Sequence, residues 1–382
     1  MHLNHFDPAA FLRDNWQKQP LLIRSPWSAW TNPLDPDDLA SLACDDDIES
    51  RLIVAKRKGL RLEHGPFRSK RFAKLGKYPW TLLVQAVDHA VPAVATLLDA
   101  FRFLPNWRID DVMVSYASDG GGVGAHFDQY DVFLIQGLGR RRWQVGERCD
   151  HATPLLPHDD LRLLADFQPM QEWLLEPGDI LYLPPGIAHN GIAVGDDCMT
   201  YSIGCRAPSI AELIAGWSDH VIEQLADDDR YADPGLALQT NPGEIPPDAV
   251  AALHAMVITA LGDRATFARW FGGYNSTPKN PDVDWSLQQP VTVGDVRKRL
   301  AGGATLVRNP ASRCSFLRQN GALLLFVDGE CFECTGPTEA FAERLCAMTP
   351  IVTGPTLTAC AATTALLTTL INKGSLALDP RP

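Results

Sequence analysis

The chain has 382 residues, of which 46% are hydrophobic and 21% are charged, and its formal net charge is −12. These values are ordinary for globular domains, and the length is sufficient for two or three of them. The acidic balance disfavours a protein whose whole surface binds nucleic acid, and the lack of an apolar run of about 18 residues disfavours a membrane role.

The N-terminal stretch and the cysteines both favour a cytoplasmic protein. Residues 1–7 lack the basic start, apolar stretch and small-residue cleavage site of a secretory signal. The nine cysteines are scattered from Cys44 to Cys360, which indicates reduced thiols rather than a disulfide framework. Cys331 and Cys334 form one isolated CxxC, a pattern that favours two strand cysteines over a zinc site.

The first 100 residues predict helices mixed with loops. Residues 8–13 open a helix, and residues 91–101 have apolar side chains at helical spacing. Neither segment carries evident chemistry.

Residues 110–206 predict a mainly β domain. Short β-rich runs alternate there with glycine and proline, in the order DVMVSYAS, DVFLIQG, RRWQVG, EWLLEPGD, ILYLPPG, IAVG and CMTYSIGC. Many short strands in series are typical of a barrel or jelly roll.

The strands stop after Arg206, and a helical segment follows. Residues 208–225 and 247–261 have the apolar period of amphipathic helices, with a linker at 239–246 and an end near residues 272–273. Such a segment could pair with its copy in a homodimer or pack on its own barrel.

Residues 274–382 predict a winged-helix-like α+β module. Helices are expected at 293–300, 338–348 and 361–371, around strands at 315–334 that turn at residues 320–321 and 328–329. Winged helices commonly bind DNA, but this region has ten Lys or Arg against nine Asp or Glu. We therefore expect a structural or protein-contacting role, and domains at 1–206, 207–273 and 274–382.

The stretch GVGAHFDQYDVF predicts part of a metal site. On a strand, His126 and Asp128 would lie on the same face, and His189 follows a turn, a strand and a second turn. Two histidines and a carboxylate leave three positions open on an octahedral ion, as non-haem Fe(II) oxygenases require. Zinc more often uses four-coordinate His and Cys sets.

Three consecutive arginines in QGLGRRRWQVG supply a candidate anchor for a co-substrate. A 2-oxo acid and dioxygen commonly fill the open side of such an iron, and a distal carboxylate needs a fixed cation. A guanidinium suits it, since it is always charged and can bind a carboxylate through two hydrogen bonds. Alternation places Arg141 on one face of the strand, with Arg140 and Arg142 on the solvated face.

Several longer stretches resemble a known family. DDVMVSYASDGGGVGAHFDQYDVFLIQGLGRRRWQVG, LEPGDILYLPPGIAHNG and YSIGCRAP are similar to the bacterial JmjC-type ribosomal oxygenases, which hydroxylate an arginine of large-subunit ribosomal protein L-sixteen. KQPLLIRSPW and ESRLI near the N-terminus also resemble that family. The resemblance implies a double-stranded β-helix of the JmjC and cupin type, a dimerisation segment and a winged-helix-like C-terminal domain.

The resemblance also implies roles for individual residues. The iron ligands fall on His126, Asp128 and His189, and the arginine that anchors 2-oxoglutarate falls on Arg141. The residues implied for the pocket of the target arginine are Asp111, Met113, Tyr130 and Ser202.

The implied activity is a hydroxylation that consumes 2-oxoglutarate and dioxygen at Fe(II), on a ribosomal protein that the acidic chain could help to attract. The alternatives are a JmjC hydroxylase or demethylase acting on another residue or protein, and a non-catalytic metal-binding cupin. The latter would use its C-terminal module to bind proteins or DNA.

Overall fold

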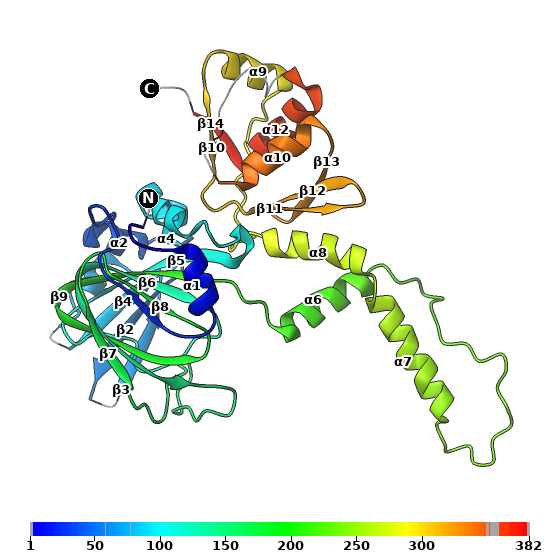
Figure 1. The fold of residues 1–382 in the computed structure, drawn as a ribbon, viewed down its shortest axis with the longest axis horizontal. Coiled ribbons are helices and arrows are strands. Elements are labelled where there is room, and N and C mark those ends of the chain that lie inside the picture. Colours follow the sequence, from blue (N-terminus) through cyan, green and yellow to red (C-terminus); the bar gives the residue numbers. More distant parts are fainter. Residues whose placement is uncertain (1–2, 58, 77, 349–350, 352–358, 380–382) are drawn as a thin grey trace. The chain divides into compact units, whose positions relative to one another are not determined.

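The computed structural model describes residues 3–57, 59–76, 78–348, 351 and 359–379 (Figure 1). The chain divides into two compact units, Met1–Ala207 and Pro208–Pro382. Among the described residues, no helix combines the length and apolar character needed to cross a membrane.

Unit 1 is built on an antiparallel sheet, which within the described residues has nine strands in the order β1-β8-β6-β9-β5-β4-β2-β3, with β7 paired to β6. The strands are β1 (Leu21–Ile23), β2 (Ser50–Lys56), β3 (Gly59–His64), β4 (Trp80–Val84), β5 (Ile109–Ala117), β6 (Val132–Arg148), β7 (Gln171–Leu175), β8 (Ile180–Leu183) and β9 (Ile187–Cys205). The predicted mainly β, jelly-roll class is confirmed.

Strands β6 and β9 are longer than the short runs that the sequence predicts. Each expected pair of runs is one continuous strand, interrupted by shifts in register between Gln136 and Arg140. Gly139 and Gly195, which look like turn residues in the sequence, have positive φ of 58° and 81° at these irregularities. Bulges of this kind bend a strand so that it can pass from one part of a barrel wall to the next.

The first 100 residues differ from the expectation of helices and loops, because four of the strands lie there. β2 and β4 pair with each other, and β4 pairs with β5, so this region extends the same sheet. The apolar run at 91–101 forms only a short helix, α5 (Pro92–Ala95), followed by a 3-10 helix, η1 (Thr96–Phe101).

The remaining short helices of unit 1 are α1 (Pro8–Asp14), α2 (Pro36–Leu42), α3 (Ser69–Phe72), α4 (Val87–Ala90) and the 3-10 helix η2 (Asn106–Arg108). Helix α1 begins where the Asp7 carboxylate accepts hydrogen bonds from the first backbone amides. Its Phe11 packs edge-on against Tyr182 of the sheet, with ring centroids 4.8 Å apart.

Alternation along β6 separates the core of unit 1 from its interior cavity. Phe133 and Ile135 belong to the large apolar core that also contains Phe11. Val132 and Leu134 face the other way and line the cavity described below. One strand therefore both anchors the fold and forms a wall of the site.

Unit 2 begins with three helices: α6 (Ile210–Ile222), α7 (Pro247–Leu261) and α8 (Arg264–Ser276). Ser209 and Glu212 form a capping box that starts α6. Helix α8 continues through Gly272 and Gly273 and ends at Ser276, close to the expected end of the helical segment. A Cβ on Gly272 would lie 2.3 Å from the Phe326 ring, so this glycine permits close packing inside the helix.

The rest of unit 2 has the winged-helix-like elements that the sequence predicts. The strands are β10 (Thr305–Arg308), β11 (Cys314–Gln319), β12 (Ala322–Val327), β13 (Glu330–Cys334) and β14 (Leu376–Asp379), and the helices are α9 (Val293–Ala301), α10 (Pro337–Cys346) and α12 (Ala361–Asn372). Asn320 and Gly321 both have positive φ, as a two-residue type I′ hairpin turn requires. A separate apolar core lies between these helices and strands.

Candidate metal and co-substrate site

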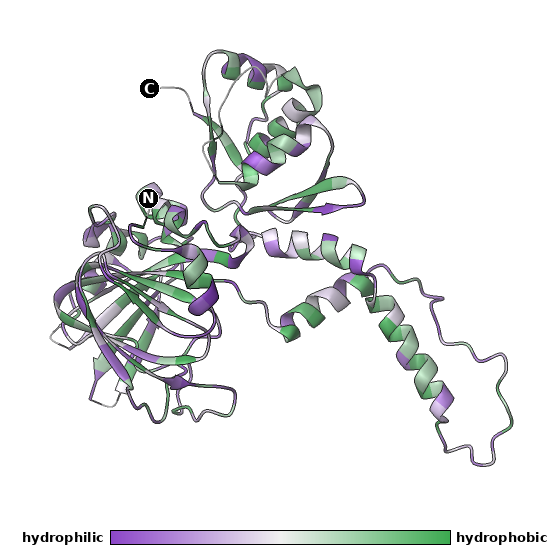
Figure 2. Ribbon diagram, viewed as in Figure 1, coloured by the Kyte–Doolittle hydropathy of each residue, from purple (hydrophilic) through white to green (hydrophobic). Residues whose placement is uncertain are grey.

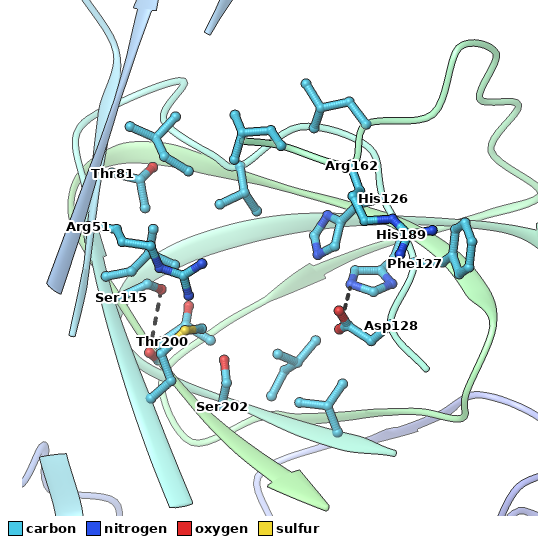
Figure 3. Close-up of a pocket in the computed structure, with 18 of the residues that line it drawn as sticks. Arg51, Thr81, Ser115, His126, Phe127, Asp128, Arg162, His189, Thr200 and Ser202 are labelled. Atoms are coloured by element: carbon cyan, nitrogen blue, oxygen red, sulfur yellow. Dashed lines mark hydrogen bonds and ion pairs between the residues drawn. The ribbon is translucent and has the colours of Figure 1, made fainter. Parts of the chain in front are cut away.

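His126, Asp128 and His189 come together in unit 1. One possible ligand atom from each lies within 4.8 Å of the others, and His189 Nε2 is 3.7 Å from an Asp128 carboxylate oxygen. In Figure 3 the three side chains gather on one side of the cavity. Within the described residues, this is the group of His, Cys, Asp and Glu side chains whose spacing suits a metal ion.

The triad converges for a different reason from the one expected. His126 and Asp128 do not lie on a regular strand; His126 forms a single β-bridge with His189. The backbones of the two histidines exchange hydrogen bonds of 3.0 and 2.8 Å, and the Asp128 carbonyl accepts one of 2.7 Å from Gly186. The start of β9 and the glycine before it thus hold the loop that carries the other two side chains.

Each histidine ring is oriented by a backbone carbonyl. His126 Nδ1 is 2.9 Å from the Gly124 carbonyl oxygen, and His189 Nδ1 is 2.8 Å from that of Ile187. A proton on Nδ1 satisfies these contacts and leaves Nε2 as the ligand atom. Burial, and then the neighbouring His126 ring, lowers the pKa of His189 to about 4. The neutral imidazole that metals bind is therefore the form present at neutral pH.

The triad opens into a cavity of about 290 Å³. Arg141, Met113, Tyr130 and Ser202, which the resemblance assigns to co-substrate and substrate, all line it. Asp111 does not appear among the lining residues. It is 5% exposed, and its carboxylate accepts a 2.9 Å hydrogen bond from the Ala86 amide.

Arg141 is a buried cation, and only some of its hydrogen-bond donors have a partner. Its side chain is inside the fold while Arg140 and Arg142 are exposed, as alternation predicts. Nη1 makes a long 3.4 Å contact to the Gly191 carbonyl, and within the described residues Nε and Nη2 have no partner. Because an unpaired buried guanidinium is costly, this arrangement fits an anionic ligand in the cavity.

Trp143 lies between Arg141 and the triad. Its ring is 5.9 Å from the Arg141 guanidinium carbon and 5.9 Å from the His189 ring centroid. A Cβ on Gly191, which pairs with Trp143 across the sheet, would lie 2.7 Å from the indole ring. The glycine therefore makes room for the indole.

Tyr130 is close to two carboxylates. Burial, followed by the charges of Asp128 and Asp111, raises the pKa of Tyr130 well above its usual value, whereas Arg51 acts in the opposite direction. The phenol is therefore neutral and able to donate a hydrogen bond.

Asp131, at the end of the loop that carries two of the triad residues, is fully buried. Its carboxylate accepts hydrogen bonds from the Tyr182 hydroxyl at 2.6 Å, Gln17 Nε2 at 3.0 Å and Arg108 Nη2 at 3.1 Å. These three groups come from the N-terminal region, η2 and β8. The network fixes the C-terminal end of this loop.

Sequence reasoning missed the part of the cavity wall that comes from the first 100 residues. Arg51 and Ile53 of β2, and Thr81 and Leu83 of β4, line the cavity. Figure 3 shows Arg51 across the cavity from the triad. The β-branched and other apolar residues of SRLIVAK and WTLLV do indicate strands. Neither stretch contains a pattern of ligand residues that would indicate a site.

A double-stranded β-helix with a His-x-Asp and a distal His at one cavity defines the JmjC and cupin class of metal-dependent oxygenases. Residues 96–213 match the JmjC domain family, and residues 259–377 match the family of ROXA-like winged helices.

Two relatives narrow the class further. The chain is 39% identical over 298 residues to the ribosomal protein uL16 3-hydroxylase of Escherichia coli, covering 78% of this chain and 79% of that protein. It is 42% identical over 216 residues to a probable ribosomal oxygenase of Haemophilus influenzae, covering 56% of this chain and 53% of that protein.

Solved structures agree with these relatives. A crystal structure of Escherichia coli YcfD has a TM-score of 0.89 at 34% identity, over 99% of this chain and 100% of that one. A structure of the same ribosomal oxygenase with cobalt and 2-oxoglutarate has a TM-score of 0.86 at 34% identity, over 99% of both chains. The chain belongs to the family of bacterial JmjC-type ribosomal oxygenases.

Proposed function

We propose that this protein uses Fe(II), 2-oxoglutarate and dioxygen to hydroxylate an arginine side chain of large-subunit ribosomal protein uL16. The observation that carries the proposal is the shared cavity of the triad and the incompletely bonded Arg141. A 2-oxo acid with a second carboxylate can reach a metal with one end and a buried guanidinium with the other. The Escherichia coli relatives, a uL16 hydroxylase and an oxygenase solved with 2-oxoglutarate, support this assignment.

The donor set fits iron. His126, Asp128 and His189 would hold the ion on one face, leaving the other face for the 2-oxo acid and dioxygen. When bound, Fe(II) with these co-substrates supplies an oxidant that converts an aliphatic C–H to C–OH, while 2-oxoglutarate becomes succinate and carbon dioxide. Arg141 would orient the 2-oxo acid by holding its distal carboxylate, and the apolar wall of Val132 and Leu134 would limit the access of water.

The chain's contribution to the reaction is positioning, because an aliphatic C–H has no acidity that a base could exploit. Met113 and Tyr130 would pack against the aliphatic stem of the arginine, and Ser202 would add a hydrogen bond. Asp111, which lies on β5 two residues before the cavity-lining Met113, would supply the opposite charge for the guanidinium. These four residues would set which carbon lies nearest to the iron.

We expect Asp111→Asn to separate the conversion of 2-oxoglutarate to succinate from the hydroxylation of the substrate. Asparagine keeps an oxygen that can accept the Ala86 hydrogen bond, so the change removes mainly the charge. Hydroxylation of the substrate should fall by at least about tenfold, the equivalent of 1.4 kcal/mol, while uncoupled conversion of 2-oxoglutarate to succinate continues. Succinate and hydroxylated product, measured in the same reaction, check this. Equal loss of both would count against Asp111 as a substrate contact.

The substrate assignment is tested by incubating the full-length protein with purified uL16, Fe(II) and 2-oxoglutarate. Mass spectrometry of the digested product should find one added oxygen on an arginine. Addition at another residue, or on another protein only, would favour a different JmjC hydroxylase, and loss of a methyl group a demethylase. A failure to form succinate would favour a non-catalytic metal-binding cupin. A ribosomal substrate would place the enzyme in the cytoplasm.

We further propose that the segment from residue 207 to 273 forms a homodimer with a second copy. In Figure 2, hydrophobic residues recur along α6 and α7. Ile210 and Ile214 of α6 are 77% and 59% exposed, and Val250 and Val257 of α7 are 53% and 56% exposed. An exposed apolar stripe at helical spacing is typical of an association surface.

The double variant Val250→Asp/Val257→Asp is expected to be monomeric, because burying two unpaired carboxylates in a helical interface is unfavourable. Light scattering after size-exclusion chromatography measures the mass directly. The control is Ala249→Asp/Thr259→Asp, two changes elsewhere on the same helix. A monomeric wild-type protein would contradict the proposed dimer.

Residues 1–206 would then form the catalytic domain and residues 274–382 a winged-helix domain that contacts protein rather than nucleic acid. The nearly balanced charge of the C-terminal region supports this division of roles, since nucleic acid binding depends largely on Lys and Arg.

A further inference from the structure

Residues 56–77 carry a charge opposite to that of the chain as a whole. They include nine of its 34 Lys and Arg residues but only one of its 46 Asp and Glu residues, Glu63. Surfaces that serve solubility alone usually mix both signs of charge. Such an excess of one sign indicates a local binding surface for a polyanion, which the net charge of −12 conceals.

The fold brings these cations together from the β2–β3 hairpin and α3. Arg71 of α3 donates hydrogen bonds of 2.8 and 3.0 Å to the Glu63 carboxylate of β3, and Arg61 Nε lies 3.6 Å from the same group. The hydrogen bonds from Arg71 lower the pKa of Glu63 the most; partial burial opposes this, and the charges of Arg71, Arg61 and Lys56 lower it further. Cations from both elements therefore surround a single carboxylate.

Six of the cations are exposed and form what we call the basic surface: Lys56, Arg57, Arg61, Arg68, Lys70 and Lys74. In the part of the chain that the structure describes, Arg61 is the one member of this set in an ion pair. The surface ends at the acidic residues 45–47, because Cys44 Sγ, just before them, is 4.0 Å from Ser69 Oγ at the start of α3. The other five ammonium and guanidinium groups remain available to an anion.

An exposed aromatic ring lies beside this surface. Tyr78 is 46% exposed, and Lys56 Nζ is 5.0 Å from the centre of its ring. Proteins that bind single-stranded nucleic acid combine such features, since the bases stack on aromatic rings while the cations contact the phosphates. An acidic peptide or a lipid headgroup has no base to stack, so Tyr78 favours a nucleic acid over these partners.

Protection of a sheet edge accounts for only part of the charge. Within the described residues β3 is the last strand of the sheet, and Lys or Arg on such an edge prevents pairing with other chains (Figure 1). That role explains Arg61, which lies on the strand. It does not explain Arg68, Lys70 and Lys74, which lie within or next to α3 and outside the sheet.

The basic surface lies next to the cavity. Strand β2, which pairs with β3, contributes Arg51 and Ile53 to the cavity wall. Leu60 of β3 lies near Leu163, another lining residue, since a Cβ on Gly124 would be 3.3 Å from the one and 2.9 Å from the other. A ligand on the basic surface would therefore be close to a substrate in the cavity.

We propose that the basic surface and Tyr78 bind single-stranded RNA beside the cavity. The choice of RNA rests on the proposed function, because a large-subunit ribosomal protein lies against ribosomal RNA in its particle. RNA that accompanies the protein would be held at the β2–β3 hairpin while the target side chain enters the cavity. Contacts to phosphates attract and position the RNA without reading its sequence.

The binding test uses the full-length protein and the fluorescence anisotropy of a labelled single-stranded RNA of about 12 nucleotides, within the usual range of site sizes. Arg57→Gln/Lys70→Gln/Lys74→Gln should weaken binding by about 10- to 100-fold at about 0.1 M salt. The slope of log affinity against log salt should become shallower by about 2, since each phosphate contact contributes about 0.7. The three side chains have no ion pair within the described residues, so the unfolding temperature should stay that of the wild type.

The matched control is Arg230→Gln/Arg297→Gln/Lys298→Gln, which removes three exposed cations from unit 2 and so changes the net charge equally. Its RNA affinity should stay within about threefold of the wild type, because distant charges are screened. Equal weakening in both triple variants would show that the RNA responds only to net charge, and would overturn the inference.

Tyr78→Ala tests the nature of the partner. It should weaken RNA binding by about 5- to 100-fold, the range for one stacked base, and change the binding of polyglutamate by less than about twofold. An unchanged RNA affinity would rule out base stacking at this surface. If the wild type binds polyglutamate or phosphatidylserine vesicles more tightly than the RNA, the partner is an acidic protein or a membrane, and the inference is wrong.

These measurements are made without Fe(II) and 2-oxoglutarate, so their outcome does not depend on catalysis. A wild-type protein that binds no RNA but forms succinate and hydroxylated uL16 would overturn this inference and leave the proposed function standing. A protein that binds RNA at the basic surface but forms no succinate would contradict the proposed function alone.

Discussion

Replacing His126 with alanine is expected to abolish the formation of both succinate and hydroxylated substrate. The variant loses one of the three proposed metal ligands. Mutation of a residue that only supports a ligand lowers metal affinity by about 10- to 100-fold, and loss of a ligand itself should lower it further. Titration with Co(II), followed by calorimetry, measures the affinity, and succinate release measures turnover. The backbone hydrogen bonds to His189 do not involve the replaced side chain, so the fold should persist.

His151→Ala is the control for this change, because His151 is an exposed histidine in the loop after β6. It should bind Co(II) and form succinate like the wild type. Normal metal affinity in His126→Ala would mean that the ion is held elsewhere, and the assignment of the triad would be wrong.

Among the substitutions proposed for this protein, Asp131→Ala is expected to lower the free energy of unfolding the most. The Arg108 side chain is 15% exposed and the Tyr182 side chain is buried, so the change leaves a guanidinium and a hydroxyl without their acceptor. Removal of one partner from a buried ion pair costs about 3–5 kcal/mol. The urea transition of unit 1, followed by near-ultraviolet circular dichroism, should move to lower concentration.

The matched control is Asp14→Ala, which removes the acid of the exposed Arg13–Asp14 pair. Its transition should stay close to that of the wild type, because exposed pairs contribute little. Equal transitions for Asp131→Ala and the wild type would show that the network does not stabilise the loop.

The grouping of His126, Asp128 and His189 could be predicted from the sequence because their pattern is local and chemical. A His-x-Asp pattern and a histidine after a proline-rich turn can be recognised in the sequence without knowledge of the backbone conformation. The strand assumed for His126 and Asp128 was wrong, yet the residues still converge, since the bridge to His189 holds the same extended geometry. Arg141 was equally accessible, because strand alternation alone separates it from its exposed neighbours.

The contributions of β2 and β4 could not be predicted in the same way. Arg51 and Thr81 are ordinary strand residues. They reach the cavity only because β2 pairs with β4 and β4 pairs with β5, a strand well separated from it in the sequence. Long-range pairing of this kind leaves no periodic signal in either segment. The placement of Asp111 was similarly inaccessible, because its partner Ala86 lies in a different strand connection.

The reciprocal backbone hydrogen bonds between His126 and His189 have a consequence for how the enzyme is made. Main-chain hydrogen bonds join these two candidate ligands to each other, so their relative position is set by the closed barrel and not by the ion. Little chain ordering then remains to be done by the ion, and metal loading can follow folding as a separate event. The cell's supply of free divalent ions, rather than the folding reaction, would decide which metal the newly made protein acquires.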